Sequence, residues 1–316
     1  MRVIIVALAS LALWVSSTTA ADTMTRVCNN CTNESTEPFV EAPPPWNLEA
    51  EVAYVIPMLG LSNDLPVKAY SPLERNSTYA TSGSCLAGIG LMMIIRYKDS
   101  PVGPYDEFII IPGLYSNPGD TGLRKFRISR IYVSHKYTTW NGRRNWNIPK
   151  HIARFDWSSH ADGTESVKIY PHDTTSLLNE EAGPSELPFF QGTFTLPPIV
   201  GLVRVPLSTA ITTYLDGIGL DVLKLSSPPL PQGNGKYGEL VGTSRNANTQ
   251  FGVSGAWASV GSLDVYQGPQ GDQIGSTGKN AVGDEYYPNF WPNMPRHNLA
   301  LRLHGSTVSF GAPDVY

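Results

Sequence analysis

Glycine and proline are spread along the whole chain, and this spacing most constrains what the chain can fold into. The 316 residues include 29 glycines and 26 prolines, with short apolar runs between them. Both residues interrupt helices and mark turns, whereas short apolar runs between turn signals are typical of buried strands. The pattern therefore predicts a mainly β protein, α+β at the margin, built as one barrel or sandwich.

The apolar runs locate the expected elements. Residues 48–56, 88–97, 108–112, 126–137, 189–205 and 299–310 carry the strand pattern. Residues 155–158 and 167–170 predict a hairpin around a turn at 161–164, and residues 102–107 predict a second tight turn. One helix is expected at residues 208–223, although 48–56 also fits a short helix. Residues 226–236 and 268–283 are expected to be loops because they are rich in Gly, Pro, Asn and Gln.

The first residues have the form of a secretory signal. A short positive start at Arg2 precedes an apolar run at residues 3–15, and small residues follow up to Ala20 and Ala21, where cleavage is expected. Later apolar runs are shorter than a membrane span requires. We therefore expect a signal peptide at 1–21, an exposed glycosylated arm at 22–45 and one β-barrel domain at 46–316, secreted or in the secretory pathway.

Sequons and cysteines agree with that route. Asn30, Asn33 and Asn76 each begin an Asn-x-Ser/Thr acceptor. The disulfide candidates are Cys28, Cys31 and Cys85. In an oxidising compartment two of the three are expected to pair, either locally within Cys-x-x-Cys or between the arm and Cys85.

A single lysine, Lys150, lies in a basic and aromatic stretch at residues 140–154. It follows Pro149 and has apolar neighbours, and no acidic residue occurs between Asp120 and Asp156. Burial and nearby positive charge both lower the pKa of a lysine from about 10.4, which makes it a nucleophile able to form a Schiff base with a carbonyl compound. The alternative is a solvated basic loop without chemistry. The charged neighbours are Arg143, Arg144, His151 and Arg154.

Other chemistries find little support. The six histidines do not stand at metal-ligand spacing with Cys, Asp or Glu, so no metal site is expected. Residues 124–154 hold nine Lys/Arg and no acidic residue, but the chain carries a net charge of −4, which argues against a nucleic-acid partner. No dinucleotide or phosphate-binding motif is complete, and no cofactor is expected.

At two motifs the sequence resembles the acetoacetate decarboxylase family. That family has a Gly-x-Tyr-x-Glu turn, followed further along by Gly-Arg-Glu-x-x-x-x-Pro-Lys-Lys. The matching residues are Gly103, Tyr105 and Glu107, and then Gly142, Arg143, Pro149 and Lys150. The resemblance covers roughly residues 85–160. It implies a mainly β, cone-shaped barrel whose interior holds Lys150 as the Schiff-base lysine, with Glu107 beside it; acetoacetate decarboxylase is itself the standard example of such an activated lysine.

The chain departs from the family at several motif positions. His151 replaces the second lysine, Arg144 replaces a glutamate, and Met92 stands where the family has another glutamate. The family's N-terminal substrate-binding arginine has no counterpart near residues 43–47. These changes favour a larger or more apolar keto compound over acetoacetate. The side chains expected to line the substrate pocket are Tyr105, Met92, Arg143, His151 and Trp146.

Three functions fit the sequence. The first is a lyase-like enzyme that forms a Schiff base through Lys150 and uses Glu107 as its acid/base partner, for decarboxylation or related aldol, dehydration or cyclisation chemistry. The second is a catalytically inactive secreted protein that binds an apolar small molecule in the same cavity. The third is a surface protein with a basic stripe and no pocket. The sequence leaves the substrate, the disulfide pairing and oligomer formation open.

Overall fold

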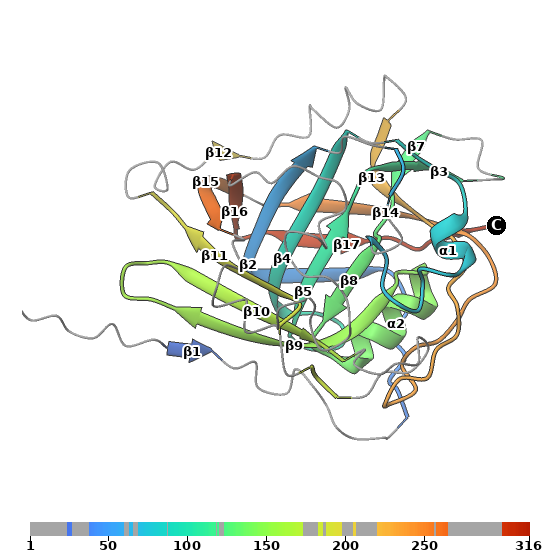
Figure 1. Ribbon diagram of the computed structural model, residues 1–316, viewed down its shortest axis with the longest axis horizontal. Coiled ribbons are helices and arrows are strands. Elements are labelled where there is room, and N and C mark those ends of the chain that lie inside the picture. The colour runs from blue at the N-terminus through green and yellow to red at the C-terminus, as the bar shows by residue number, and fades with distance from the viewer. Residues whose placement is uncertain are drawn as a thin grey trace, which may run out of the picture.

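The structure is a computed structural model. It describes residues 24–26, 38–59, 63–65, 69–86, 88–117, 119, 123–172, 183–185, 188–197, 205–206, 220–255, 257–264 and 299–316. Strands dominate these residues and close into a barrel, which confirms the mainly β prediction. The arrangement is shown in Figure 1.

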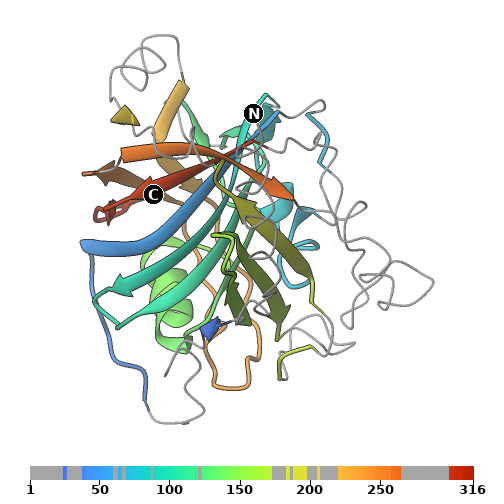
Figure 2. The same ribbon diagram turned by 90° about the vertical axis from the view of Figure 1, so that its left-hand side faces the viewer.

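One closed ring of strands forms the body of the protein. In spatial order the ring consists of β2 (Trp46–Leu59), β4 (Ile89–Asp99), β5 (Tyr105–Ile111), β8 (Arg130–Val133), β9 (Lys150–Ser159), β10 (Glu165–Pro171), β11 (Phe190–Thr195), β15 (Trp257–Asp264) and β16 (Leu299–His304), which returns to β2. All neighbours are antiparallel except β8 and β9, which run parallel. Figure 2 shows the long curved β2 beside β4 and β5.

A second set of strands covers one outer face of the ring. It consists of β3 (Ser84–Leu86), β6 (Leu114–Ser116), β7 (Arg124–Phe126), β13 (Leu220–Ser227), β14 (Ala247–Ser254), β17 (Thr307–Phe310) and β18 (Asp314–Val315). The set joins the ring because β17 pairs with the start of β2. Two short strands pair with strands of the ring. Strand β1 (Met24–Arg26) pairs with β9, and β12 (Val205–Pro206) pairs with β15. The helices are α1 (Thr78–Thr81) and α2 (Lys136–Trp146).

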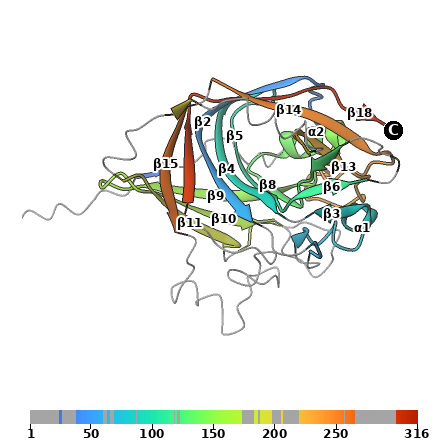
Figure 3. The same ribbon diagram turned by 90° about the horizontal axis from the view of Figure 1, so that it is seen from above.

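Two apolar cores result from the two layers. One core collects buried side chains from every strand of the ring, among them Met92, Phe108 and Ala153, and therefore fills the interior of the ring. The other core lies on the opposite face of β4 and β5, where Ile95 and Ile109 pack with side chains of β13, β14 and β17. Strand β5 is buried along its whole length because both cores contact it. Figure 3 shows α2 between the ring and β13–β14, and α2 contacts β8, β9 and β14.

Most predicted strands are present, with three corrections. The turn expected at 102–107 ends at Pro104, because β5 already begins at Tyr105. The run 126–137 is strand only at Phe126 and at 130–133, and α2 begins at Lys136. The helix expected at 208–223 lies largely outside the described residues, and its end at 220–223 is strand β13. The hairpin of β9 and β10 is confirmed.

The arm expected at residues 22–45 packs where it is described. Phe39 stacks on Trp140 of α2 at 5.4 Å between ring centroids, and the amide of Ala42 donates to Asn141 at 2.9 Å. Asn141 also donates to the carbonyl of Val40. Residues 38–45 therefore cover helix α2 instead of extending freely from the barrel.

Candidate functional site

A helix end positions the central lysine. Helix α2 ends at Trp146 because Asn147 adopts the left-handed conformation, with φ 54°, and its amide donates to the carbonyl of Arg143. Pro149 follows and cannot continue a helix. Lys150 is then the first residue of β9, so its side chain lies against the helix that precedes it in sequence.

The amine of Lys150 is buried and has three polar neighbours. Its Nζ lies 2.9 Å from Oε2 of Glu107, 2.8 Å from Oγ1 of Thr138 and 3.4 Å from Oη of Tyr105. Burial lowers the pKa of the lysine, and the attraction and hydrogen bond of Glu107 oppose that shift without cancelling it. The amine is therefore easier to deprotonate than that of an exposed lysine. The Glu107 carboxylate, which contacts it, is placed to take the proton.

Two tyrosines hold the Glu107 carboxylate. Oη of Tyr97 donates to Oε1 at 3.2 Å, and Oη of Tyr105 donates to Oε2 at 3.4 Å. Burial, followed by the nearby negative charge of Glu107, raises the pKa of both tyrosines well above the usual value. Both phenols thus stay protonated and serve as hydrogen-bond donors to Glu107.

Gly142 makes room for the lysine side chain. A Cβ built at this position would lie 2.6 Å from Cδ and 2.9 Å from Cε of Lys150. Thr138, one helical turn earlier on the same face of α2, contacts the end of that side chain. The glycine of the second motif is therefore explained by direct contact between α2 and the lysine.

A narrow apolar pocket reaches Glu107 from the second core. Its walls are side chains of β4, β5, β13, β14 and β17, among them Met93, Ile109, Phe251 and Phe310. Its free volume is about 40 Å³. Glu107 is one of the residues that line this pocket, and its carboxylate contacts the amine of Lys150.

Strand register decides which predicted residues reach the pocket. Glu107 pairs with Ile95 on β4, and Ile109 pairs with Met93, so these side chains share one face. Met92 alternates to the other face and is fully buried in the ring interior, where it cannot line the pocket. Met92, which was expected to line the substrate pocket, is therefore not among the residues that line this pocket, whereas Met93 is.

The same alternation decides which core the lysine faces. Lys150 is paired with Ile131 of β8, and both residues face the second core with Glu107 and Ile109. The lysine therefore lies between the ring and the strands β13, β14 and β17, which belong to the same closed barrel.

Arg143 and His151 form a separate buried network with Glu74. Nη1 of Arg143 lies 2.9 Å from Oε1 of Glu74, and Nε2 of His151 lies 2.7 Å from Oε2. Burial of Glu74 favours its neutral form, but His151 and Arg143 outweigh this and hold the pKa of the carboxyl below its usual value. Arg143 also donates to the backbone carbonyl of Lys150 at 3.3 Å. Neither residue, although both were expected to line the substrate pocket, is among those that line the pocket at Glu107.

Trp146 does not line the pocket but packs behind Phe310, which does. Its ring packs edge-on against Trp46 at 5.1 Å and lies 5.8 Å from the ring of Phe310, which lines the pocket. Its Nε1 donates to the carbonyl of Gly311. Among the predicted pocket residues, Tyr105 is the one whose polar atom reaches the amine of Lys150.

The solvated-loop interpretation of residues 140–154 does not hold. The stretch is the end of α2 followed by β9, and Lys150 and Arg143 are 5% and 0% exposed. Arg144 and Arg154 are exposed. The carboxylates absent from the local sequence arrive from elsewhere in the chain, since Glu107 comes from β5 and Glu74 from the segment before α1.

Several site residues were not found from the sequence. They are Tyr97, Thr138 and Glu74, together with the reason for Gly142. Had residues 136–146 been recognised as a helix, the four-residue spacing of Thr138 and Gly142 would have placed both on one face. Tyr97 and Glu74 carried no local signal.

The remaining predicted residues lie away from this site. Asn76 is exposed just before α1, and Cys85 is half-buried on β3 and forms no disulfide with another described residue. Asn30, Asn33, Cys28 and Cys31 lie outside the described residues. The described part of the chain contains no cluster of three or more metal-ligating side chains. Its helices are too short or too polar to cross a membrane.

Comparisons with known proteins give partial matches. No protein-family model matches the chain. It is 30% identical over 112 residues to the protein NEOXANTHIN-DEFICIENT 1 of Oryza sativa subsp. japonica, covering 35% of this chain and 34% of that protein. The protein of the same name from Arabidopsis thaliana is 28% identical over 114 residues, 36% of this chain and 37% of that protein. The match thus spans about a third of the length of these curated relatives.

The chain is also similar in fold to solved structures of acetoacetate decarboxylase and of an acetoacetate decarboxylase-like enzyme. The crystal structure of acetoacetate decarboxylase from Legionella pneumophila has a TM-score of 0.49 and 13% sequence identity, covering 87% of this chain and 88% of that chain. An acetoacetate decarboxylase-like enzyme from Sphingomonas wittichii RW1 has a TM-score of 0.47 and 8% identity, covering 88% of this chain and 94% of that chain.

Proposed function

We propose that this protein forms a Schiff base between Nζ of Lys150 and a carbonyl compound. The observation that carries the proposal is a buried amine of lowered pKa that contacts the Glu107 carboxylate at 2.9 Å. A lysine needs its neutral form to attack a carbonyl carbon, and burial favours that form by lowering the pKa of Lys150. Because Glu107 is within hydrogen-bond distance, it accepts the proton that the amine must lose.

The neighbouring groups fit the following steps. After the amine attacks, the carbinolamine loses water, and the resulting protonated imine draws electrons from the adjacent carbon–carbon bond. Carbon dioxide then leaves from a β-keto acid, or an aldehyde leaves from a β-hydroxy ketone once Glu107 has taken its hydroxyl proton. A proton from Glu107 or from water is added to the enamine carbon, and water hydrolyses the imine to release the product. Thr138 and Tyr105 hold the nitrogen in place through their hydroxyl groups.

The pocket indicates the substrate class. Its walls are mostly apolar, and its one carboxylate, Glu107, repels a second carboxylate. The free volume of about 40 Å³ holds little more than one water molecule. A keto compound larger than a few atoms requires Phe251 and Phe310 to move aside. A larger, mostly apolar keto compound, such as a β-hydroxy ketone, therefore fits the proposal better than a small keto acid.

Borohydride trapping tests the proposal. The protein is incubated with a panel of small and large ketones, diketones and keto acids, reduced, digested and analysed by mass spectrometry. We expect an adduct on Lys150 that is absent from Lys150→Arg and retained in the matched control Lys98→Arg, whose side chain is exposed. If no compound leaves an adduct on Lys150, the Schiff-base proposal is wrong.

A second candidate function is the binding of an apolar small molecule without catalysis. The apolar walls at Met93, Phe251 and Phe310 support it. The name of the curated relatives refers to a deficiency in neoxanthin and states no reaction. Titration with apolar ligands, followed by tyrosine and tryptophan fluorescence, separates the candidates. The binding function requires that Lys150→Met keeps wild-type affinity and that wild type forms no imine.

The route of the protein is a further part of the proposal. The signal-like residues 1–21, the arm at 22–45 and the barrel domain at 46–316 correspond to a secreted glycoprotein, and the exposed Asn76 is accessible for glycosylation. Expression in a eukaryotic secretory host should give a mass that falls on treatment with an N-glycosidase. An unchanged mass in both wild type and Asn76→Gln would contradict the route.

A further inference from the structure

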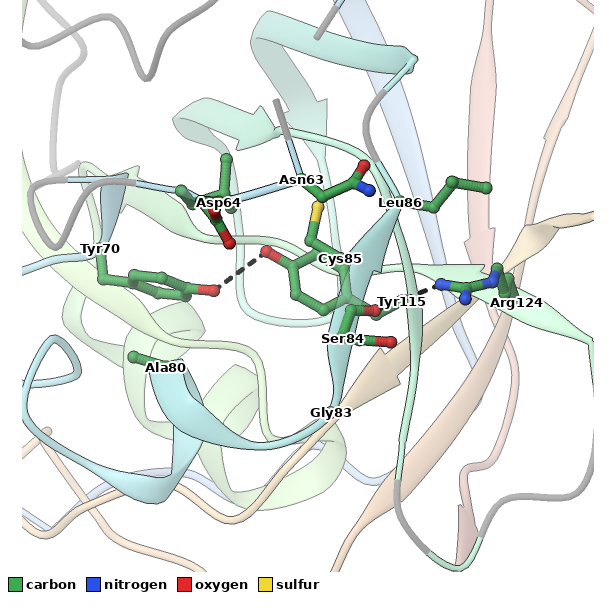
Figure 4. Close-up of a pocket in the computed structure, with 11 residues that line it drawn as sticks. Asn63, Asp64, Tyr70, Ala80, Gly83, Ser84, Cys85, Leu86, Tyr115 and Arg124 are labelled. Carbon is green, nitrogen blue, oxygen red and sulfur yellow. Dashed lines mark hydrogen bonds between the residues drawn. The ribbon is translucent and has the colours of Figure 1, made fainter. Parts of the chain in front are cut away.

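A second, polar pocket lies apart from the lysine site and is lined by a different set of residues. Its volume is about 440 Å³, within the usual range of small-molecule sites. It is bounded by the segment before α1, by α1 itself and by β3, β6 and β7, and Figure 4 shows its lining. None of its lining residues takes part in the Lys150 site described above. The lining includes Asp64, Tyr70, Cys85, Tyr115 and Arg124.

Two buried tyrosine hydroxyls meet inside this pocket. Oη of Tyr70 and Oη of Tyr115 lie 3.0 Å apart, and the two side chains are 4% and 3% exposed. Figure 4 shows both hydroxyl groups pointing toward each other, with the sulfur of Cys85 beside them. A hydroxyl pair shares one of its two protons, so the other proton can be donated to an acceptor in the pocket.

A buried arginine, Arg127, lies behind the Tyr115 ring, on the side away from the pocket. The guanidinium of Arg127 is fully buried and lies 4.0 Å from the centroid of the Tyr115 ring. Within the described chain its acceptors are all uncharged, namely the carbonyls of Tyr79, Ser82 and Ser226 and the side chain of Asn117. These dipoles solvate the charge of Arg127 but do not neutralise it. The guanidinium therefore contributes a positive potential at the Tyr115 side of the pocket.

A second arginine stands at the rim. Arg124 lines the pocket, is half-buried and uses one N–H for the carbonyl of Ser84 at 3.4 Å, which leaves further donors for a ligand. Burial raises the pKa of the Cys85 thiol, while the neighbouring Tyr115 hydroxyl and the positive charges of Arg127 and Arg124 act in the opposite direction. Both arginines therefore act electrostatically on the same space.

We propose that this pocket is a second ligand site, which binds the anionic group of a small organic molecule through Arg124 and the Tyr70–Tyr115 hydroxyl pair. The positive charge of Arg127, which lies behind the Tyr115 ring, further stabilises an anion bound in this pocket. Asp64 also lines the pocket and carries the opposite charge, so the anionic group belongs on the Arg124 side and away from Asp64. Ala80 and Leu86 offer apolar contacts to the rest of the ligand.

Isothermal titration calorimetry with three matched probes tests the site. The probes are benzoate, benzyl phosphate and the neutral benzyl alcohol, titrated into the full chain at low and high salt. We expect at least one of the anions to bind more than tenfold tighter than benzyl alcohol and to weaken as salt rises. Arg124→Gln should reduce that affinity more than tenfold, and Tyr70→Phe, which removes only the hydroxyl, several-fold.

Two controls keep the result specific. Arg154→Gln removes an exposed arginine of β9 and should leave anion affinity unchanged, as should Lys150→Arg, which alters the other site. The proposal is overturned if benzyl alcohol binds as tightly as both anions, if Arg124→Gln matches Arg154→Gln, or if Lys150→Arg abolishes binding. In the last case the anion occupies the lysine site.

Discussion

Replacing Gly142 by alanine tests whether contact with α2 holds the reactive amine. The new Cβ would lie 2.6 Å from Cδ of Lys150, whereas carbon atoms pack at about 3.5–4.0 Å, so the lysine side chain must move by about 1 Å. Alanine stabilises a helix interior by about 1 kcal/mol over glycine, and overpacking a core costs about 1–3 kcal/mol. Stability should thus change by less than about 2 kcal/mol.

The effect on chemistry should be much larger. A displacement of about 1 Å at a reacting group can cost about 100-fold in rate. Since the same shift moves Nζ away from Glu107 and Thr138, we expect the rate of borohydride trapping to fall by about that factor. Urea denaturation measures the stability change separately.

The matched control is Gly183→Ala, because a Cβ at that position meets no atom within 4 Å. It should trap ketones at the wild-type rate. If Gly142→Ala also traps at the wild-type rate while folding normally, the contact between α2 and Lys150 does not position the amine.

Three further predictions concern the carboxylates and the hydroxyl at the site. Glu107→Gln removes the charge that holds the pKa of Lys150 up, so the pH profile of trapping should shift to lower pH; an unmoved profile would separate Glu107 from the amine. Thr138→Val keeps the shape but loses a buried hydrogen bond to Nζ, so we expect roughly tenfold slower trapping and a loss of about 1.5 kcal/mol of unfolding free energy in urea; trapping at the wild-type rate would show that Thr138 does not position the amine. Glu74→Gln breaks a buried ion pair and should cost about 3–5 kcal/mol of unfolding free energy at neutral pH. Because the pKa of Glu74 is depressed in the fold, wild type should lose this stability as pH falls below about 4.5, and the variant should lack that acid dependence; parallel acid curves would refute it.

Element type was largely predictable where the local sequence is apolar. The runs behind β2, β4 and β16 are rich in Val, Ile, Leu and Met, and each became a strand. Helix α2 was missed because Lys136–Trp146 contains Thr, Asn, Gly and aromatic residues, which are weak helix formers. Tertiary packing against β8, β9 and β14 stabilises it instead.

The sequence by itself identified the two residues on which the proposed chemistry depends. Lys150 follows Pro149 in a recognisable motif, and Glu107 belongs to another, and the structure brings their charged atoms to 2.9 Å. A motif can be read locally because its residues are close in the chain. The motifs could not reveal that the carboxylate facing Arg143 is Glu74, since Glu74 belongs to neither motif and the contact depends on the whole fold.

Only the tertiary structure decided on which side of each strand the chemistry lies. Neighbouring strand residues point to opposite faces, so a shift of one position separates Met93 in the pocket from Met92 in the ring interior, and Lys150 from His151. Both faces of β5 are buried, so apolar character along the chain did not distinguish them. The register with β4 and β8 does, because it is set by the closure of the entire barrel.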